Sequence, residues 1–521
     1  METAAMKTLV TPGVYIAEKS AFPNTVIEPA TAVAAFIGWT ERAEYNGNSL
    51  RGKPMRLSSL ADFHAYFGGS PIAEHVRFSF SLAESPGTGN APSETNSPLA
   101  HRDSTPFALR ADRCRLVQTG EKYGLYLAVL QFFANGGSDC YVVSVGRFME
   151  AITADAIFAG IDALETEPEP TILVVPEAVM LQQEACYRVQ QSMLSHCAAM
   201  QNRIAILDVW EGYRERSDTP DVVAEFRNGI VSEALSYGAA YFPWLHTQTI
   251  SPAQMSVINL DTQSRSVLVT LLRAEIVASG ADESQRALKE TVIKDVLTVA
   301  DAASAARLDN TLSSFSAVFN TLRTEMAQRL NLLPPSASMA GVYAQVDTVR
   351  GVWAAPANVG VENVVALAVE TSDEGQADLN VSVDGKSVNA IRNLPGRGVL
   401  VWGARTLDGN SLDWRYINVR RTCNMIRQAI ATAMASLAHE PNDPTTWNSA
   451  KSMIANYLQS VWVRGGLVGA TAADAFEVNI GISSSMTADD VASGVMRAVV
   501  QVCVTRPAEY IVLTVSQQLQ T

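Results

Sequence analysis

The chain has 521 residues, of which 47% are hydrophobic and 18% are charged, and its formal net charge is −14. A chain of this length and composition can bury a large core and form about two to four domains. The acidic excess excludes proteins that coat nucleic acid or an anionic membrane, because both classes need a basic surface. The six cysteines are scattered without a CxxC pair, so we expect reduced thiols in a cytosolic protein.

The N-terminal end of the chain carries a strand pattern and no targeting signal. Residues 1–10 lack the basic and apolar regions of a secretory leader, and no later stretch approaches the roughly 18 apolar residues of a membrane span. In TPGVYIAE, at residues 11–18, Val14, Ile16 and Glu18 share one face, which predicts a strand. Pro12 suits an edge strand but not a central one.

The next part of the chain predicts a sheet covered by helices. Residues 31–39, TAVAAFIGW, predict a first buried strand, and residues 79–112, rich in Ser and Pro, predict a loop or insertion. Gly136 and Gly137 are placed to end the helix that follows this insertion. Further strands are predicted from Cys140, Thr171, Arg203 and Gly238, with helices that include Ala154–Leu164 and Ala178–Ala198. This alternation is typical of a parallel sheet.

A helical segment and then a mixed segment follow. Residues 261–331 have apolar side chains at spacings near three and four, which predicts a helical insertion whose stripes are packing faces. Residues 333–358 predict irregular structure. Strands are predicted at residues 398–404, 414–419, 475–481 and 496–504, and helices at Arg420–Leu437 and Thr445–Val463. Ile511, Leu513 and Val515 alternate near the C-terminal end and predict a last strand.

Motifs that carry chemistry are weak. Gly47, Gly52 and Lys53 have the spacing of a phosphate-binding loop, but Pro54 replaces the Ser or Thr that binds Mg²⁺, which favours a surface turn. The acidic turn at Gly409 lacks the last carboxylate of a calcium loop and predicts a hairpin turn. The histidines form no HExxH pair, and no GxSxG motif is present. We therefore expect no catalytic residue, no cofactor and no metal.

A cluster of arginines is the strongest local feature in this acidic chain. Only Asp408 and Asp413 oppose the cluster within residues 392–427. Its members are Arg392, Arg397, Arg405, Arg415, Arg420, Arg421 and Arg427. Two interpretations stay open: solvated side chains with weak intrachain ion pairs, or a contact surface for an acidic partner.

Five stretches, in the same order, resemble the contractile tail sheath family of bacteriophages and phage-derived injection systems. They are TPGVYIAE at 11–18, LPPSASMAGVYAQVDTVRGVWAAPAN at 333–358, GVLVWGARTL at 398–407, WRYINVRR at 414–421 and RPAEYIVLTV at 506–515. Each stretch alone is weak, but five in order are specific. The resemblance covers the start of the chain and most of residues 332–521, and leaves the helical insertion outside.

The resemblance implies a structural polymer and not an enzyme. Its subunits stack as hexameric rings around an inner tube protein, and contract from a metastable extended state to drive the tube through a target membrane. Baseplate and terminator proteins are further implied partners, without nucleic acid and without direct membrane insertion. Assembly is implied in the bacterial cytoplasm, after which the sheath is part of a phage tail or a phage-tail-like particle.

The resemblance also implies that strands from both chain ends join a sheet of neighbouring subunits. A strand added to an exposed edge satisfies a row of backbone groups, and contacts that do not close generate helical filaments. The residues implied for these strand arms are Val14, Tyr15, Ile16, Glu18, Tyr510, Ile511, Val512, Leu513, Thr514 and Val515. The seven arginines are candidate contacts to the tube or to a neighbour. Flexible linkers are expected around Ala17–Pro29 and Arg506–Glu509.

The predicted fold class combines α/β and α+β structure: an α/β sheet domain with inserted segments, and a C-terminal α+β assembly domain completed by the terminal strands. The predicted parts are an N-terminal extended arm at 1–22, an α/β region at 23–260, the helical insertion at 261–331, the assembly domain at 332–505 and a C-terminal strand arm at 506–521. Two alternatives stay open. One is a nucleotide-binding α/β enzyme with its ligand at Gly47–Lys53 or beyond the strand ends. The other is a self-assembling tube or shell that does not contract.

Overall fold

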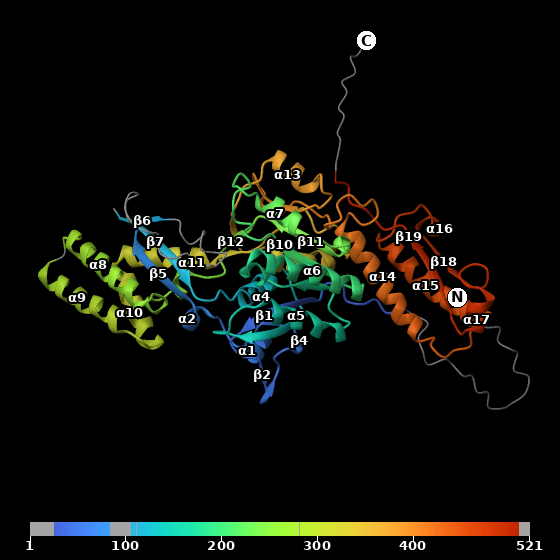
Figure 1. Ribbon diagram of the computed structural model, residues 1–521, viewed down its shortest axis with the longest axis horizontal. Helices are drawn as coiled ribbons and strands as arrows, with labels where there is room; N and C mark the ends of the chain where they lie inside the picture. The colour runs from blue at the N-terminus through green and yellow to red at the C-terminus, as the bar shows by residue number, and fades with distance from the viewer. Residues whose placement is uncertain (1–25, 84–105, 111, 281, 510–521) are drawn as a thin grey trace, which may run out of the picture. The chain divides into compact units, whose positions relative to one another are not determined.

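The computed structural model describes residues 26–83, 106–110, 112–280 and 282–509 (Figure 1). The chain divides into two compact units. Of the described residues, the larger unit contains those within 29–428, 465–468 and 504–509, and the smaller unit contains those within 26–28, 429–464 and 469–503. The predicted assembly domain at 332–505 is thus distributed over both units. Within the described ranges, no helix has the length and hydropathy needed to cross a membrane.

A nine-stranded sheet forms the centre of the larger unit, in the order β14-β17-β16-β11-β10-β9-β1-β8-β4. Its strands are β1 (Ala34–Thr40), β4 (Pro54–Leu57), β8 (Cys140–Arg147), β9 (Ile172–Val174), β10 (Ile204–Asp208), β11 (Gly238–Phe242), β14 (Val359–Gly360), β16 (Asn389–Leu394) and β17 (Gly398–Val401). The strands from β16 to β8 are parallel, and β4, β17 and β14 are antiparallel at the edges. The predicted parallel sheet is therefore confirmed, with β1 between β8 and β9.

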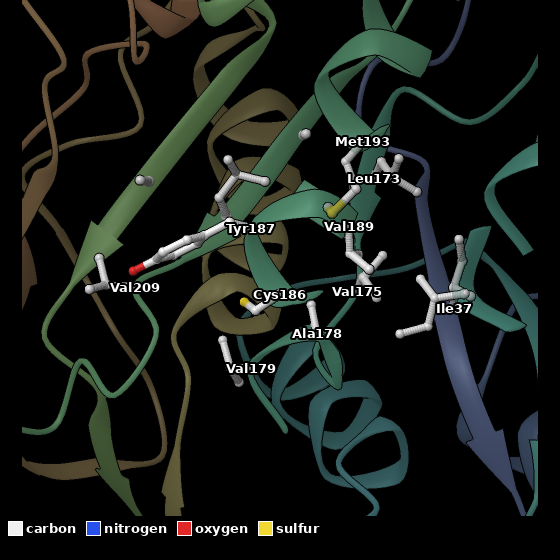
Figure 2. Packing of buried hydrophobic residues seen from close by; sticks show 14 of the residues in the cluster. Ile37, Leu173, Val175, Ala178, Val179, Cys186, Tyr187, Val189, Met193 and Val209 are labelled. Carbon is white, nitrogen blue, oxygen red and sulfur yellow. The ribbon is translucent and has the colours of Figure 1, made fainter. Parts of the chain in front are cut away.

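Helices cover both faces of this sheet (Figure 1). They include α4 (Leu125–Ala134), α5 (Ala154–Asp162), α6 (Gln183–Met200) and α12 (Ser336–Arg350). Because side chains alternate along a strand, Ala35 and Ile37 of β1 pack in the core with α5 and α6, while Ala34 and Phe36 pack in the core with α4 and α12. Figure 2 shows side chains of α6 close to those of the sheet. The predicted capping of α4 is also confirmed, since Gly136 has a positive φ and Gly137 N–H donates to the Phe132 carbonyl.

Two sequence predictions in this unit are wrong. Residues 333–358 are not irregular, because α12 begins directly after Pro335. Its small residues suit close packing: a Cβ atom on Gly341 would lie 2.5 Å from the Phe132 carbonyl oxygen in α4. Residues 414–419 are not a strand, because α14 (Ile417–Ala435) begins within them and only Tyr416 forms a single bridge, to Arg405.

The predicted loop at residues 79–112 is wrong at its described ends. An antiparallel sheet in the order β5-β7-β6 is formed by β5 (Arg77–Leu82), β6 (Phe107–Leu109) and β7 (Asp112–Thr119). Phe78 and Phe80 alternate with serines, and both aromatic side chains are buried. The Ser/Pro-rich composition concealed this short alternation. Residues 84–105 of the predicted loop lie outside the described residues.

The predicted helical insertion is confirmed. Its helices are α8 (Thr262–Ala278), α9 (Glu283–Thr298), α10 (Ala302–Phe315) and α11 (Ala317–Leu330). Asp261, Asp282, Asp301 and Ser316 cap their N-termini with side-chain oxygens. Leu268 and Leu272 of α8 share one core with Phe78 and Phe80 of β5. The apolar stripes are therefore packing faces, as their spacing predicted.

Shorter elements complete the larger unit. They are α1 (Leu60–Phe67), α2 (Ile72–His75), α7 (Val222–Gly229), α13 (Asp373–Asn380), the hairpin of β2 (Glu44–Tyr45) and β3 (Asn48–Ser49), and a sheet of β13 (Leu332–Leu333), β12 (Leu245–Thr247) and β15 (Val364–Leu367). The boundary between the units falls within α14, after Gln428.

The smaller unit combines helices with a two-stranded sheet. Its further elements are α15 (Pro444–Val463), α16 (Ala472–Ala475), β18 (Phe476–Ile480), α17 (Ala488–Ala492) and β19 (Ala498–Val502). The apolar stripe of α15 includes Ala450, Ile454, Leu458 and Val461, which are all buried. The predicted helix at 445–463 and the predicted strands at 475–481 and 496–504 are thus confirmed.

Candidate assembly site

The predicted strand arms lie outside the described residues. This holds for Val14, Tyr15, Ile16, Glu18, Tyr510, Ile511, Val512, Leu513, Thr514 and Val515. Their pairing with neighbouring subunits therefore stays a prediction. What the described residues do contain is a sheet that such strands could join, formed by β18 and β19.

One edge of the two-stranded sheet is open along β19. The strands are antiparallel, with Val478 opposite Val500, and Cys503 N–H donates to the Ala475 carbonyl oxygen at 2.9 Å. Hydrogen-bonded and non-hydrogen-bonded pairs alternate along an antiparallel ladder, so the N–H and C=O groups of Val500 and Val502 point away from β18. No strand among the described residues pairs with this edge. The edge therefore presents backbone donors and acceptors to a further strand.

The side chains of this sheet are covered unevenly. Val478 and Ile480 of β18 are buried and only 5% and 9% exposed, and β18 contacts α15 (Figure 1). Val500 and Val502 of β19 lie on the same face as Val478 but are only half-buried. A sheet of two strands is marginally stable by itself. A third strand beside β19 would complete both the backbone ladder and the apolar face.

Arg421 of the arginine segment is buried and belongs to a network within the larger unit. Its guanidinium forms a bidentate pair with Asp347 of α12, at 2.8 and 2.6 Å, and also donates to the Thr31 carbonyl at 2.8 Å. Its side chain is 3% exposed, and that of Asp347 is 5% exposed. The hydroxyl groups of Thr31 and Thr171 extend the network to Asp347 and to the Thr31 carbonyl, respectively. Arg421 thus holds the chain near residue 31, where the chain enters the larger unit.

Arg405 makes a similar contact near the other end of the chain. Its Nε and Nη2 atoms donate to the Glu509 carboxylate at 2.8 and 2.6 Å, and Nη1 donates to the Asn380 carbonyl at 2.9 Å. Tyr416 donates its hydroxyl to the same carboxylate at 3.1 Å. The Arg405 side chain is 4% exposed and that of Glu509 is 20% exposed. Bidentate pairs of this kind fix direction as well as distance.

The other five arginines differ in burial: Arg420 is buried, Arg392 and Arg415 are half-buried, and Arg397 and Arg427 are exposed. Arg420 is buried, with its guanidinium 3.6 Å from the centroid of the Trp414 ring and 4.2 Å from that of Tyr237, and burial lowers its pKa. Arg392 pairs with Asp373, and Arg415 donates to the Gly409 carbonyl. Arg397 is exposed and donates to the side chain of Asn358. Arg427 is exposed and donates to the Gln201 carbonyl at 3.4 Å. Arg405, Arg420 and Arg421 are thus buried rather than solvated, and Arg392, Arg405 and Arg421 form ion pairs within the chain. Contact of the exposed members with a partner stays a prediction.

Comparison with known families shows the family to which the chain belongs. The model of the phage tail sheath protein central domain matches residues 246–407, and that of the phage tail sheath C-terminal domain matches residues 410–518. The two matches together span just over half of the chain. The chain belongs to the phage tail sheath family. Its relatives include the tail sheath proteins of Enterobacteria phage T4 and of Vibrio phage KVP40, 30% and 29% identical over 138 residues, which are 26% of this chain.

The curated relatives are much longer than the match, and the solved structures cover nearly the whole sheath chain. The match spans about a fifth of each curated relative, 20% in both cases. The sheath complex of the extracellular contractile injection system PVC, in the contracted state, has a TM-score of 0.58 and 24% identity over 98% of both chains. The helical sheath of the anti-feeding prophage, also in the contracted state, has a TM-score of 0.56 and 24% identity over 98% of this chain and 100% of that one. At these identities the shared property is the fold.

Two buried carboxylates occupy positions where a nucleotide-binding fold would place its ligand. Ligands of open α/β sheets bind beyond the carboxyl ends of the strands, with phosphates at helix N-termini. In this sheath chain, Glu177 follows β9 and accepts the N–H groups of Gly124 and Leu125 at the start of α4, at 2.8 and 3.1 Å. Asp208 ends β10 and accepts Ser336 N–H at the start of α12, at 2.9 Å. The chain's own carboxylates therefore cap both helices.

Burial dominates the titration of both carboxylates. It raises the pKa of Glu177 to about 7, against the opposing effect of its bonds to the N–H groups of Leu125, Trp39 and Gly124. It raises the pKa of Asp208 to about 7, against its bonds from Ser336. No local sequence pattern indicated these caps, because each carboxylate is far in sequence from the helix that it caps.

The weak chemical motifs of the sequence have ordinary structural roles in this sheath chain. Gly47 and Gly52 have positive φ angles in the exposed turns beside β3, so the P-loop spacing belongs to surface turns. His196 and Cys197 are both buried, and burial together with Arg203 lowers the pKa of His196 to about 4. No group of three or more potential ligands is placed to hold a metal ion in the part of the chain that the structure describes.

Proposed function

We propose that the chain is a sheath subunit that polymerises helically around an inner tube and contracts from a metastable extended state to drive the tube through a target membrane. The observation that carries the proposal is the open edge of β19, in a chain of the phage tail sheath family. The similar solved chains come from sheaths in the contracted state and from a baseplate of the anti-feeding prophage. Stacked hexameric rings, with baseplate and terminator proteins at the ends, are the arrangement proposed for this chain.

In this proposal the strand arms of neighbouring subunits complete the β18–β19 sheet. The arm residues are Val14, Tyr15, Ile16, Glu18 and Tyr510–Val515. The half-buried faces of Val500 and Val502 favour such an addition, because an added strand covers apolar surface and pairs the outward backbone groups. Exchange of identical elements links protomers without requiring a new interface.

Contraction in this proposal needs no catalytic residue. A kinetically trapped extended state stores energy in its packing, and many subunits that each gain a few kcal/mol together perform large mechanical work. We accordingly propose a structural role and not an enzymatic one. The nucleotide-binding alternative lacks support, because Glu177 and Asp208 cap the helix N-termini that would bind phosphate. Assembly in the bacterial cytoplasm, before incorporation into a tail or tail-like particle, is part of the proposal.

Contacts with the tube or with a neighbouring subunit are proposed for the exposed arginines Arg397 and Arg427. Both lie on the surface of the chain. Within the chain, Arg397 contacts Asn358 and the Trp402 ring, and Arg427 contacts the Gln201 carbonyl, which are all neutral groups. An exposed guanidinium pairs well with the carboxylates of an acidic partner. The buried members of the arginine segment are not included in this contact.

Val500→Pro tests the proposal at the open edge. Proline removes the N–H group of Val500, which points away from β18, so the ladder within the subunit keeps its hydrogen bonds. Val500→Ala is the matched control, because it shortens the side chain and keeps the N–H group. Both variants are co-expressed with the neighbouring genes and imaged by negative-stain electron microscopy.

The expected result is ribbed cylinders in two lengths for the unmodified chain and for Val500→Ala, and no cylinders for Val500→Pro. Cylinders from Val500→Pro at the normal yield would show that no strand joins this edge. Cylinders of one fixed length from every variant would instead favour a tube or shell that does not contract.

A further inference from the structure

The chain from Val504 to Glu509 is fastened to the larger unit at both of its ends. Thr505 N–H donates to the Gly466 carbonyl at 3.2 Å, and Asn418 donates its side-chain amide to the Thr505 carbonyl at 2.8 Å. Four residues later, Arg405 and Tyr416 hold the Glu509 carboxylate. The contacts thus hold Thr505, the residue before the linker predicted at Arg506–Glu509, and Glu509, the last residue of that linker.

Arg405 is itself held rigidly by the nine-stranded sheet. Asn389, the first residue of β16, accepts Arg405 N–H at 2.7 Å and donates to the Arg405 carbonyl at 2.8 Å. The same amide donates to the Ala240 carbonyl of β11 at 3.1 Å. Asn389 is fully buried. A pull on Glu509 is consequently transmitted through Arg405 to two central strands.

The N-terminal side of the larger unit has an equivalent contact. Arg421 donates to the Thr31 carbonyl while it pairs with Asp347, and Thr171 donates to the same carbonyl at 2.7 Å. Thr31 lies three residues before β1, an inner parallel strand between β8 and β9. The larger unit thus has a buried arginine at each place where the chain enters or leaves it.

We propose that Arg405 and Arg421 are anchors that fix the points at which the two terminal arms leave the body, and through which pulling force between subunits enters the nine-stranded sheet. The force-bearing role rests on the proposed function. The two anchoring contacts do not depend on it. The proposal assigns Arg405 and Arg421, two of the three buried members of the arginine segment, to the subunit's own chain ends. It also places the start of any free C-terminal tether after Glu509, and not at Arg506.

Glu509→Gln tests the C-terminal anchor in the isolated subunit. The substituted glutamine keeps the size of the side chain but loses the charge-assisted bonds with Arg405. A nitroxide label at Ala508→Cys, in a Cys503→Ser background, reports the motion of the segment by electron paramagnetic resonance. The same background without the new cysteine corrects for labelling elsewhere. We expect Glu509→Gln to raise the mobile fraction of the label about tenfold, because charge-assisted bonds are stronger than neutral ones.

Asp413→Asn is the matched control. Asp413 lies 3.9 Å from Arg506 of the same segment, but the two side chains are 82% and 56% exposed. Removing this exposed pair is expected to leave the label spectrum unchanged. A Glu509→Gln spectrum equal to that of the unmodified chain would overturn the anchor. Arg405→Lys keeps the charge without the two-pronged geometry and is expected to give an intermediate mobile fraction; a spectrum as immobile as the unmodified one would also count against the anchor.

Sheaths assembled from Glu509→Gln subunits test the transmission of force. We expect cylinders that assemble at the normal yield but contract in separate segments, visible as gaps in electron micrographs. Continuous contraction, together with a mobile label in the isolated subunit, would overturn the force-bearing role and leave the anchor in place. If the unmodified chain forms no cylinder at all, the proposed function fails, whereas the label experiment still decides the anchor.

Discussion

The nine-stranded and the two-stranded sheet differ in how far their own chain completes them. In the nine-stranded sheet, every strand from β16 to β8 has a partner on both sides, and the strands from β11 to β1 are buried along their whole length. In the two-stranded sheet, β19 has one partner, and its residues alternate between exposed and half-buried. The nine-stranded sheet supplies stability to the subunit through inner strands that are paired on both sides, and β19 leaves backbone groups for another chain.

The arginine side chains of residues 392–427 also differ in whether their partners lie within the subunit. Arg405 and Arg421 satisfy their charges within the subunit, with carboxylates of Glu509 and Asp347. Arg397 and Arg427 end at the surface. One stretch of sequence therefore serves both the interior and the exterior, and composition alone did not separate the two.

The largest effect is expected from a cavity beside an inner strand of the nine-stranded sheet. Phe36 of β1 is fully buried, with its ring edge-to-face at 5.2 Å from Phe132. Phe36→Ala is expected to lower the free energy of unfolding of the isolated subunit by about 4 kcal/mol. Val499→Ala in β19, where the side chain is 38% exposed, should lower it by less than ~1 kcal/mol. Urea unfolding followed by circular dichroism measures both, and similar losses would contradict the difference between the sheets.

A smaller loss is expected from the buried ion pair at the N-terminal side of the body. Asp347→Asn leaves Arg421 buried without its charged partner, which is expected to cost about 3 kcal/mol in unfolding free energy. The matched control is Asp373→Asn, because Asp373 pairs with Arg392 but is 92% exposed. Its loss should be below ~0.5 kcal/mol. Equal losses in thermal or urea unfolding would show that Arg421 is not the buried support that its contacts indicate.

The next effect is a dependence of stability on pH that originates beside the inner strands of the nine-stranded sheet. Burial raises the pKa of Asp208 and of Glu177 to about 7, so the folded chain holds these protons more tightly than the unfolded chain. Between the unfolded and the folded pKa the folded state binds more protons, and the unfolding free energy therefore falls as pH rises from about 4 to about 7. The size of this contribution to the unfolding free energy follows from the two pKa shifts. It is fully present below the unfolded pKa values and is lost above pH ~7.

Asp208→Asn isolates one of the two carboxylates. The amide cannot titrate, so the slope of unfolding free energy against pH is expected to be shallower than in the unmodified chain. Urea unfolding across this pH range measures the slope. Asp490→Asn is a suitable control, because Asp490 lies in the first turn of the short helix α17 and bonds from Thr487, the N-cap residue, lower its pKa. An unchanged slope in Asp208→Asn would show that Asp208 ionises normally in the folded state.

The sequence predicted those elements whose pattern is local. The apolar runs of β1, β8, β9, β10 and β11 and the stripes of α8 to α11 could be found because each is long enough to show its period. Helix α12 was missed because small residues after two prolines resemble a loop, although they are what allows Gly341 to approach α4. Short strands such as β6 carry too few residues to show alternation.

The candidate site was predictable only where neighbours in sequence are also neighbours in space. The strands β18 and β19 follow from their apolar alternation, but the open edge follows from pairing, which is not a local property. The anchors could not be found from sequence, since Arg405 and Glu509 are separated by 104 residues and Thr31 and Arg421 by 390. A cluster of arginines indicates that positive charges need partners, but it does not indicate which side chains are buried.

The smallest effect on the subunit is expected from the exposed arginines. Arg427 makes one long bond, of 3.4 Å, to the Gln201 carbonyl, so Arg427→Gln should change the unfolding free energy by less than ~0.5 kcal/mol. If this surface meets an acidic partner, the same substitution weakens binding, and the loss shrinks as salt rises. Co-sedimentation of the variant with the co-expressed tube protein, at low and high salt, measures this. Arg464→Gln is the control, because Arg464 is partly exposed but is paired with Glu28 in the smaller unit. Equal binding by both variants and the unmodified chain would assign Arg427 to the solvated surface, and leave Arg397 as the remaining exposed candidate for a contact with the partner.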